Sequence, residues 1–151
     1  MPFSMFERIA EVAWDSYPRP SYIKVCRVPE ALRALYYADE KDDSKDVADQ
    51  LSWAVGNDHC GSYYPVLLGA LPFIEDVLRN GGIRSKSIAL CFLYNILGHV
   101  LDQDCGGFTN SSGNSVDIDA EFRSWMAGLR PLLLDMVQHE DKMSNLARAL
   151  L

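Results

Sequence analysis

Residues 63–101 read YYPVLLGALPFIEDVLRNGGIRSKSIALCFLYNILGHVL and decide the fold of this chain. In the first half of this stretch, apolar residues recur at the three- and four-residue spacing of a single helix face. Asn80-Gly81-Gly82 separates it from a second half that is apolar on nearly every side from residue 88 to residue 97. A helix of that composition is covered all round by protein. We therefore expect residues 83–101 to form the buried centre of the molecule, with Phe92 and Ile96 in its core.

Pro72 lies inside the helical pattern of the first half. Proline has no N–H to donate, and its ring crowds the carbonyl four residues earlier, so it kinks or breaks a helix. The apolar pattern continues on both sides of Pro72. We expect a helix over residues 67–78 that is kinked at Pro72 but not ended there, with Gly69 easing the crowding.

Helical patterns also flank this centre. Ser4 and Glu7 have the spacing of a capping box, which predicts a first helix over residues 5–14. Further helices are expected over residues 29–38, over residues 44–55 with Asp43 or Ser44 as the cap, and over residues 141–151. Another helix should start at Asp117 or Asp119 and be kinked or split at Pro131. No stretch alternates with period two, so we expect no strands. Residues 102–116 are rich in Gly, Ser and Asn and predict an exposed loop.

Length and composition indicate one domain over residues 1–151, because 48% of its 151 residues are hydrophobic. Helices joined by short links predict an all-α solenoid of antiparallel pairs with about seven helices. The net charge of -7 would repel nucleic acid and attract a basic protein. The four cysteines form no CxxC pair, which favours a reducing cytosol over a disulfide framework. We expect neither a signal peptide nor a membrane span, and hence a cytoplasmic protein.

Several short motifs occur in a recognisable order between Val28 and Val100. They are Val28-Pro29-Glu30-Ala31-Leu32, then His59-Cys60-Gly61-Ser62-Tyr63-Tyr64, then Ala70-Leu71-Pro72-Phe73-Ile74, and finally Ile83-Arg84. In this order the chain resembles short HEAT-repeat-like proteins of bacteria. Residues 129–151 look like one more helix pair of that kind. The resemblance implies a HEAT-like α-solenoid that acts by binding protein, and it implies no reaction.

Residues that could form a zinc site, a catalytic nucleophile or a calcium loop do not have the spacing that these sites require. His59, Cys60, His99 and Cys105 do not have the spacing of a zinc motif. Cys60 beside His59 could suggest a nucleophile and its base, but neighbouring loop residues rarely face each other. Counted from Asp102, the position that would need a bidentate glutamate in a calcium loop is Gly113. We therefore expect no catalytic residue, no cofactor and no metal.

Acidic turns and adjacent tyrosines are the candidates for a binding surface. On a helix, Tyr36-Tyr37 and Tyr63-Tyr64 cannot both point inward, so one residue of each pair should be exposed, and exposed tyrosines are favoured anchors at interfaces. We expect the acids and Tyr37 to lie at helix-linking turns along one face. The predicted partner-binding residues are Tyr37, Asp39, Glu40, Asp42, Asp43, Asp102 and Asp104.

These observations predict a protein-binding module without catalysis. The more specific hypothesis is an immunity protein that neutralises a cognate toxin, a basic nuclease domain, because an acidic surface would mimic nucleic acid and accelerate capture of a basic partner. The alternative is a HEAT-type scaffold or regulatory subunit of a multiprotein complex. Neither nucleic acid nor a membrane is expected as a partner.

Overall fold

The structure is a computed structural model and describes residues 4–39, 41–105, 107–139 and 143–151. Most of this part of the chain is helical, as predicted. The α-helices are α1 (Met5–Glu11), α2 (Val28–Tyr36), α3 (Ser44–Val55), α4 (Leu67–Asn80), α5 (Ile83–Ile96), α6 (Ile118–Gly128), α7 (Arg130–His139) and α8 (Ser144–Ala149), with two short 3-10 helices, η1 (Trp14–Ser16) and η2 (Gln103–Cys105).

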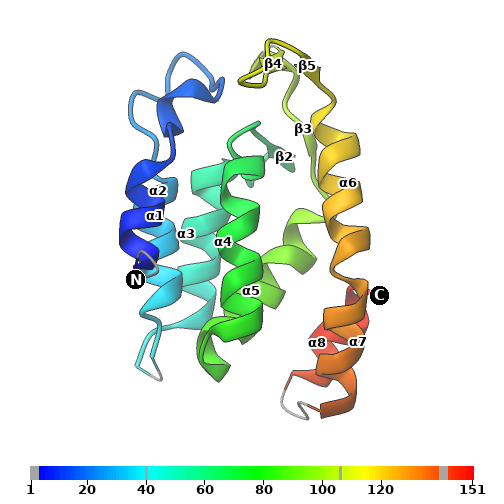
Figure 1. Cartoon of the computed structure of the whole chain (residues 1–151). Coiled ribbons are helices and arrows are strands. Elements are labelled where there is room, and N and C mark those ends of the chain that lie inside the picture. The colour runs from blue at the N-terminus through cyan, green and yellow to red at the C-terminus, as the bar shows by residue number, and fades with distance from the viewer. Residues whose placement is uncertain (1–3, 40, 106, 140–142) are drawn as a thin grey trace.

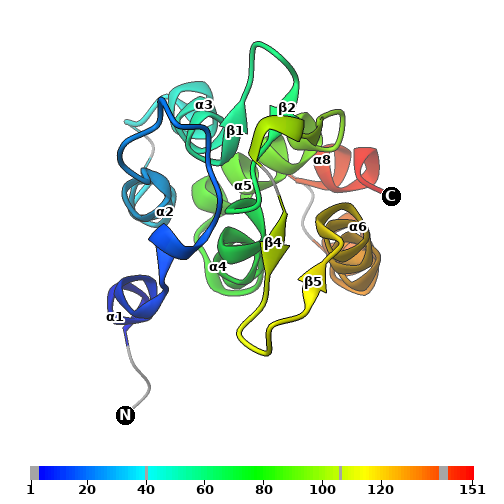
Figure 2. The same ribbon diagram turned by 90° about the horizontal axis from the view of Figure 1, so that it is seen from above.

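The helices lie side by side around α4 and α5 (Figure 1). Seen from above, α2 and α3 lie on one side of this centre, and α6 and α8 lie on the other (Figure 2). Helix α5 contacts α2, α3, α4 and α8. None of the helices in the described part of the chain is long and apolar enough to cross a lipid bilayer.

Helix α5 is buried on most of its surface. Phe92 and Ile96 are fully buried, which confirms their predicted place in the core. The helix ends at Ile96, however, earlier than predicted. Tyr94 and Leu97 are exposed, so the expectation that protein covers this segment all round is wrong on one side. The reason is geometric, because the neighbouring helices leave that side of α5 facing solvent.

Helix α4 continues through Pro72, as predicted. Pro72 is exposed, whereas Phe73 and Ile74 beside it are buried. The helix therefore accommodates the proline on its solvent side. Gly69 is required by a different neighbour, since a Cβ built there would lie 2.9 Å from the ring of Tyr17. A glycine at this position lets Tyr17 pack directly against the helix backbone.

Two small sheets correct the expectation that the chain has no strands. Strand β2 (Ser62–Tyr63) pairs antiparallel with β1 (Gly56–Asn57) and parallel with β3 (Val100–Leu101). Strands β4 (Phe108–Thr109) and β5 (Ser115–Val116) form a hairpin within the segment expected to be a plain loop. Each strand has two residues, which is too short to show an alternating pattern.

The helix ends differ from the predicted ones in several places. The capping box of Ser4 and Glu7 is present, but α1 ends at Glu11, where Val12 becomes extended and Trp14 donates its indole N–H to the carbonyl of Ile9. Helix α3 has the predicted bounds, with the carboxylate of Asp43 accepting from the N–H of Lys45. The predicted split near Pro131 occurs between α6 and α7. Part of the expected last helix, residues 140–142, lies outside the described residues.

Candidate functional site

The irregular segment 17–27 forms one wall of the main pocket. Its two prolines, Pro18 and Pro20, keep the preceding residues out of helical conformation. The guanidinium of Arg19 then fixes the fold of the segment. It donates to the carbonyls of Ile23 and Lys24 at 3.0 and 3.1 Å, and to the Asp15 carboxylate at 2.8 Å. This wall is therefore held by hydrogen bonds within a few residues of one another.

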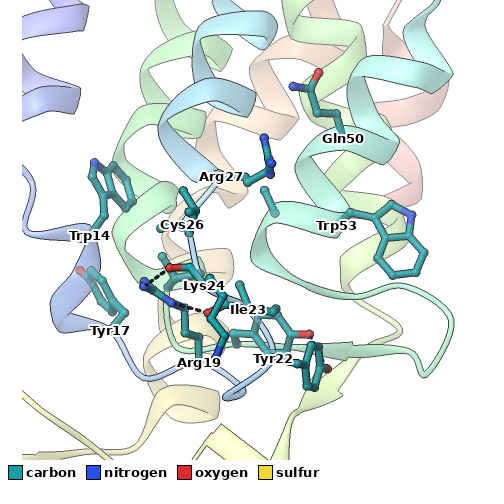
Figure 3. A pocket seen from close by; sticks show the side chains of 14 residues that line it. Trp14, Tyr17, Arg19, Tyr22, Ile23, Lys24, Cys26, Arg27, Gln50 and Trp53 are labelled. Carbon is teal, nitrogen blue, oxygen red and sulfur yellow. Dashed lines mark hydrogen bonds between the residues drawn. The ribbon is translucent and has the colours of Figure 1, made fainter.

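The pocket lies between this segment, the outer face of α3 and the residues that lead into α4 (Figure 3). Its volume is about 480 Å³. We call it the aromatic pocket, and its lining residues are Trp14, Tyr17, Arg19, Tyr22, Ile23, Lys24, Val25, Cys26, Arg27, Gln50, Trp53, Ala54, Tyr64 and Val66. Segments far apart in sequence meet here, so only tertiary packing creates the site.

Large apolar side chains around the aromatic pocket are exposed to solvent. Tyr22 is 66% exposed, Val25 is 63% exposed and Trp53 is 46% exposed. The indole of Trp53 packs edge-on against the His59 ring, with centroids 5.2 Å apart, which holds it at the mouth. Deeper in the pocket Trp14 is buried, and Tyr17 stacks on Phe108 of β4 at 4.9 Å. Exposed aromatic residues over a preformed hollow are typical of sites that bind other molecules.

The charge of the aromatic pocket is opposite to that of the whole chain. Arg19, Lys24 and Arg27 line it, and none of its described lining residues is Asp or Glu. Arg19 and Arg27 have acidic partners in Asp15 and Glu30, the second pair at 3.2 Å, but both carboxylates lie outside the lining. The ammonium of Lys24 donates to the carbonyl of Ser21. The pocket is thus a locally basic site on an acidic protein.

Two titratable groups of the pocket, the phenol of Tyr64 and the thiol of Cys26, have raised pKa values. The hydroxyl of Tyr64 lies 3.3 Å from that of Tyr22. Burial, and then this hydrogen bond, raise the pKa of Tyr64. Burial also raises the pKa of the Cys26 thiol, and this outweighs the hydrogen bond with the Val28 backbone and the nearby Arg19 charge, which both lower it. A thiol with a raised pKa is a poor nucleophile, so Cys26 is poorly suited to covalent chemistry.

Most of the predicted binding residues at the α2–α3 link are exposed. Tyr37 is exposed and stacks on Phe6 with ring centroids 4.9 Å apart. Asp39, Asp42 and Asp43 are exposed as well. They form a turn in which Asp42 accepts from the N–H of Asp39. Glu40 lies outside the described residues.

The structure does not bring the other predicted residues to this link. Asp102 and Asp104 lie in and beside η2, where Asp102 accepts from the hydroxyl of Ser62 at 3.0 Å. Arg84, at the start of α5, binds the carbonyl of Asp42, whereas Asp102 follows the end of α5. That helix has 14 residues and is therefore about 20 Å long. The two acidic groups lie at opposite ends of the helices (Figure 1).

The residues considered above for a metal site or a nucleophile make ordinary packing and electrostatic contacts in the folded chain. His59 packs on Trp53, and the Nε2 atom of His99 lies 3.5 Å from Asp58. Burial and the charges of Asp102 and Asp104 raise the pKa of Cys105 to about 11. Among the residues that the structure describes, no group of three or more His, Cys, Asp and Glu side chains could hold a metal ion.

Sequence reasoning missed the aromatic pocket, because the patterns that predict helices over residues 5–14 and 29–38 leave segment 17–27 between them unassigned. A signal was present in its composition. Aromatic and basic residues interleave as Tyr17, Arg19, Tyr22 and Lys24, and no acid occurs from residue 16 to residue 29. In a chain with 21 acidic residues, such a stretch stands out as a candidate binding segment.

The chain was compared with models of protein families, with curated proteins and with solved structures, and none of the three comparisons found a match.

Proposed function

We propose that this chain is a protein-binding module that uses the aromatic pocket as its docking site. The observation that carries the proposal is the set of exposed side chains, Tyr22, Val25 and Trp53, around a hollow of about 480 Å³. Tyr, Trp and Arg are the residue types that dominate binding energy at protein interfaces, and the pocket contains all three.

Within this class we favour an immunity protein that captures a basic toxin domain in the cytosol. The net charge of -7 supports rapid capture of a basic partner. Pairs of helices with short links, α2 with α3 and α4 with α5, support the HEAT-like arrangement that the sequence predicts. The alternative, a scaffold or regulatory subunit, shares the same docking site and differs in the identity of the partner.

The test is affinity capture from the source cell with matched variants, followed by mass spectrometry. The baits are the natural chain, a Tyr22→Ala/Trp53→Ala variant, and Tyr94→Ala as control, because Tyr94 is 61% exposed but lies on α5 away from the pocket. We expect a partner that is retained by the natural chain and the control and lost by the double variant.

The outcome also separates the two candidates. A basic toxin as the retained partner supports the immunity function, and a subunit of a stable complex supports the scaffold function. A partner recovered equally by all three baits would contradict the aromatic pocket as the docking site. Thermal melts of each variant establish that the substitutions have not unfolded the protein.

A further inference from the structure

We propose that the aromatic pocket recognises a partner segment in which an apolar side chain is flanked by carboxylates. This inference rests on the proposed function and adds the chemical class of the segment that enters the site. It is carried by the juxtaposition of an apolar hollow with Arg19, Lys24 and Arg27 and by the lack of acids among its described lining residues.

The hollow itself fits an anchoring side chain. Pockets of roughly 300–1,000 Å³ bury most of a small ligand, and this one has about 480 Å³. Trp14, Tyr64 and Val66 are buried within its walls, while Tyr22 and Trp53 are exposed at its mouth. An aromatic or branched aliphatic side chain of the partner that enters the pocket would leave water and pack against these apolar surfaces.

Arg27 and Lys24 are the cations best placed to bind carboxylates beside the anchor. The guanidinium of Arg27 extends toward Gln50 of α3 (Figure 3), and its side chain is 71% exposed. An arginine has five N–H donors, and the Glu30 pair is made through one terminal nitrogen. Arg19 contributes charge and rigidity, since its N–H groups already bind Ile23, Lys24 and Asp15.

The surrounding charge makes this recognition directional. An acidic segment is repelled by a protein with a net charge of -7 and is attracted only where the local charge is reversed. Opposed charges of this kind exclude wrong orientations and fix the register of a bound segment. The same net charge disfavours a nucleic acid strand, whose phosphates would extend beyond the pocket. A short acidic and apolar peptide is attracted by the basic pocket and places no negative charge beyond it.

The probe is a library of random peptides displayed on phage and selected on the full chain. We expect enrichment of peptides with Trp, Phe, Leu or Ile next to Asp or Glu. A parallel selection on the Lys24→Glu/Arg27→Glu variant should keep the apolar preference and replace the acids with Lys or Arg. Selection on Tyr94→Ala should return the same peptides as the natural chain.

A labelled peptide from the selection then gives affinities by fluorescence anisotropy. Its dissociation constant should rise by at least about tenfold on the Lys24→Glu/Arg27→Glu variant, since two ion pairs become repulsions. Trp53→Ala should weaken it as well, and Tyr94→Ala should leave it unchanged. Circular dichroism melts confirm that each variant is folded.

Several outcomes would overturn the proposal. Enriched peptides without acids would leave the protein-binding function standing and remove only the charge preference. Failure to enrich any peptide, together with binding of a fluorescent nucleotide or of anionic vesicles, would assign the pocket to phosphate groups instead. The role of the pocket as the docking site for cellular partners fails separately, if those partners are retained by the Tyr22→Ala/Trp53→Ala bait.

Discussion

The phenol of Tyr63 joins two parts of the molecule that are distant in sequence. Tyr63 lies in β2 and is almost fully buried, and its hydroxyl donates a hydrogen bond to the carboxylate of Asp119 in α6. The ring also packs edge-on against Phe122, with centroids 5.7 Å apart. This one side chain therefore links the small sheet to the C-terminal helices through both polar and apolar contacts.

Stability at alkaline pH should depend on this hydrogen bond. Burial, and then the bond to Asp119, raise the pKa of Tyr63 above the ordinary value of about 10. The folded state thus holds the proton more tightly than the unfolded chain. The stabilisation is complete below pH 10 or so, and it is lost as pH rises through the folded-state pKa.

We expect Tyr63→Phe to lower the free energy of unfolding at neutral pH by about 1.5–3 kcal/mol, the range for hydrogen bonds to charged groups. Its stability should also fall less steeply above about pH 10 than that of the natural chain. Urea denaturation across this pH range measures both effects. Tyr94→Phe, at an exposed position, should match the natural chain, and parallel curves for Tyr63→Phe would contradict the prediction.

At the scale of single elements, the start of α3 is determined by residues that are close in sequence. The carboxylate of Asp43 accepts from the N–H of Lys45 at 2.8 Å. An N-cap of this kind satisfies one of the backbone donors that a helix start leaves without a partner. Asp43 is also a predicted partner-binding residue, so its two roles must be separated by experiment.

Replacing Asp43 with Ala should destabilise the protein by about 1 kcal/mol, because the cap is lost. Asp43→Asn keeps an oxygen acceptor and removes the charge, so it should be close to the natural chain in stability. Chemical denaturation compares the three proteins. Equal destabilisation by Ala and Asn would show that charge, and not the capping hydrogen bond, is what α3 requires at this position.

Elements with local signals were predictable from the sequence. The capping box of Ser4, the start of α3 after Asp43 and the break before Pro131 all depend on residues close in sequence. Elements defined by distant partners were not. Tyr63 and Tyr64 are both buried, against the expectation that one would be exposed, because distant segments cover each of them: Tyr63 packs on Phe122 of α6, and Tyr64 lies in the wall of the aromatic pocket.

The same distinction explains the outcome at the candidate site. Exposure of Tyr37 beside the half-buried Tyr36 was predictable from helix geometry alone. The aromatic pocket was not, since Tyr22, Trp53 and Tyr64 come from three separate segments that meet only in the folded chain. Sequence patterns show which faces are apolar, but they do not show where two such faces leave a hollow between them.

At the scale of the whole molecule, charge is distributed unevenly. Asp39, Asp42 and Asp43 lie at the end where α2 turns into α3, and Asp102 and Asp104 lie at the opposite end (Figure 1). The aromatic pocket is nearer the second group, because the N–H of Asp102 donates to the carbonyl of Tyr63, whose neighbour Tyr64 lines the pocket. A basic partner whose acidic segment is anchored in the pocket would therefore bring the rest of its surface closer to Asp102 and Asp104 than to the α2–α3 link.

This arrangement sharpens the test of a basic partner. If attraction by the acidic surface accelerates capture, the association rate should fall steeply as salt is added, since the Debye length shrinks from roughly 30 Å at 0.01 M to about 8 Å at 0.15 M. Stopped-flow measurements with the partner recovered by affinity capture give this rate. Dissociation should change less than association.

The last prediction concerns which acids matter. At an ionic strength of 0.15 M, charges separated by the length of α5, about 20 Å, act independently because they are more than a Debye length apart. Asp102→Asn/Asp104→Asn should then slow association more than Asp42→Asn/Asp43→Asn, while at 0.01 M both variants should slow it. The Asn replacements keep oxygen acceptors for the N–H groups of Asp104 and Lys45, so stability should be preserved. A larger effect of the Asp42 and Asp43 pair would move the docking site to the α2–α3 link. An association rate that does not change with salt or with any of the four substitutions would remove the reason to expect a basic toxin and would favour the scaffold function.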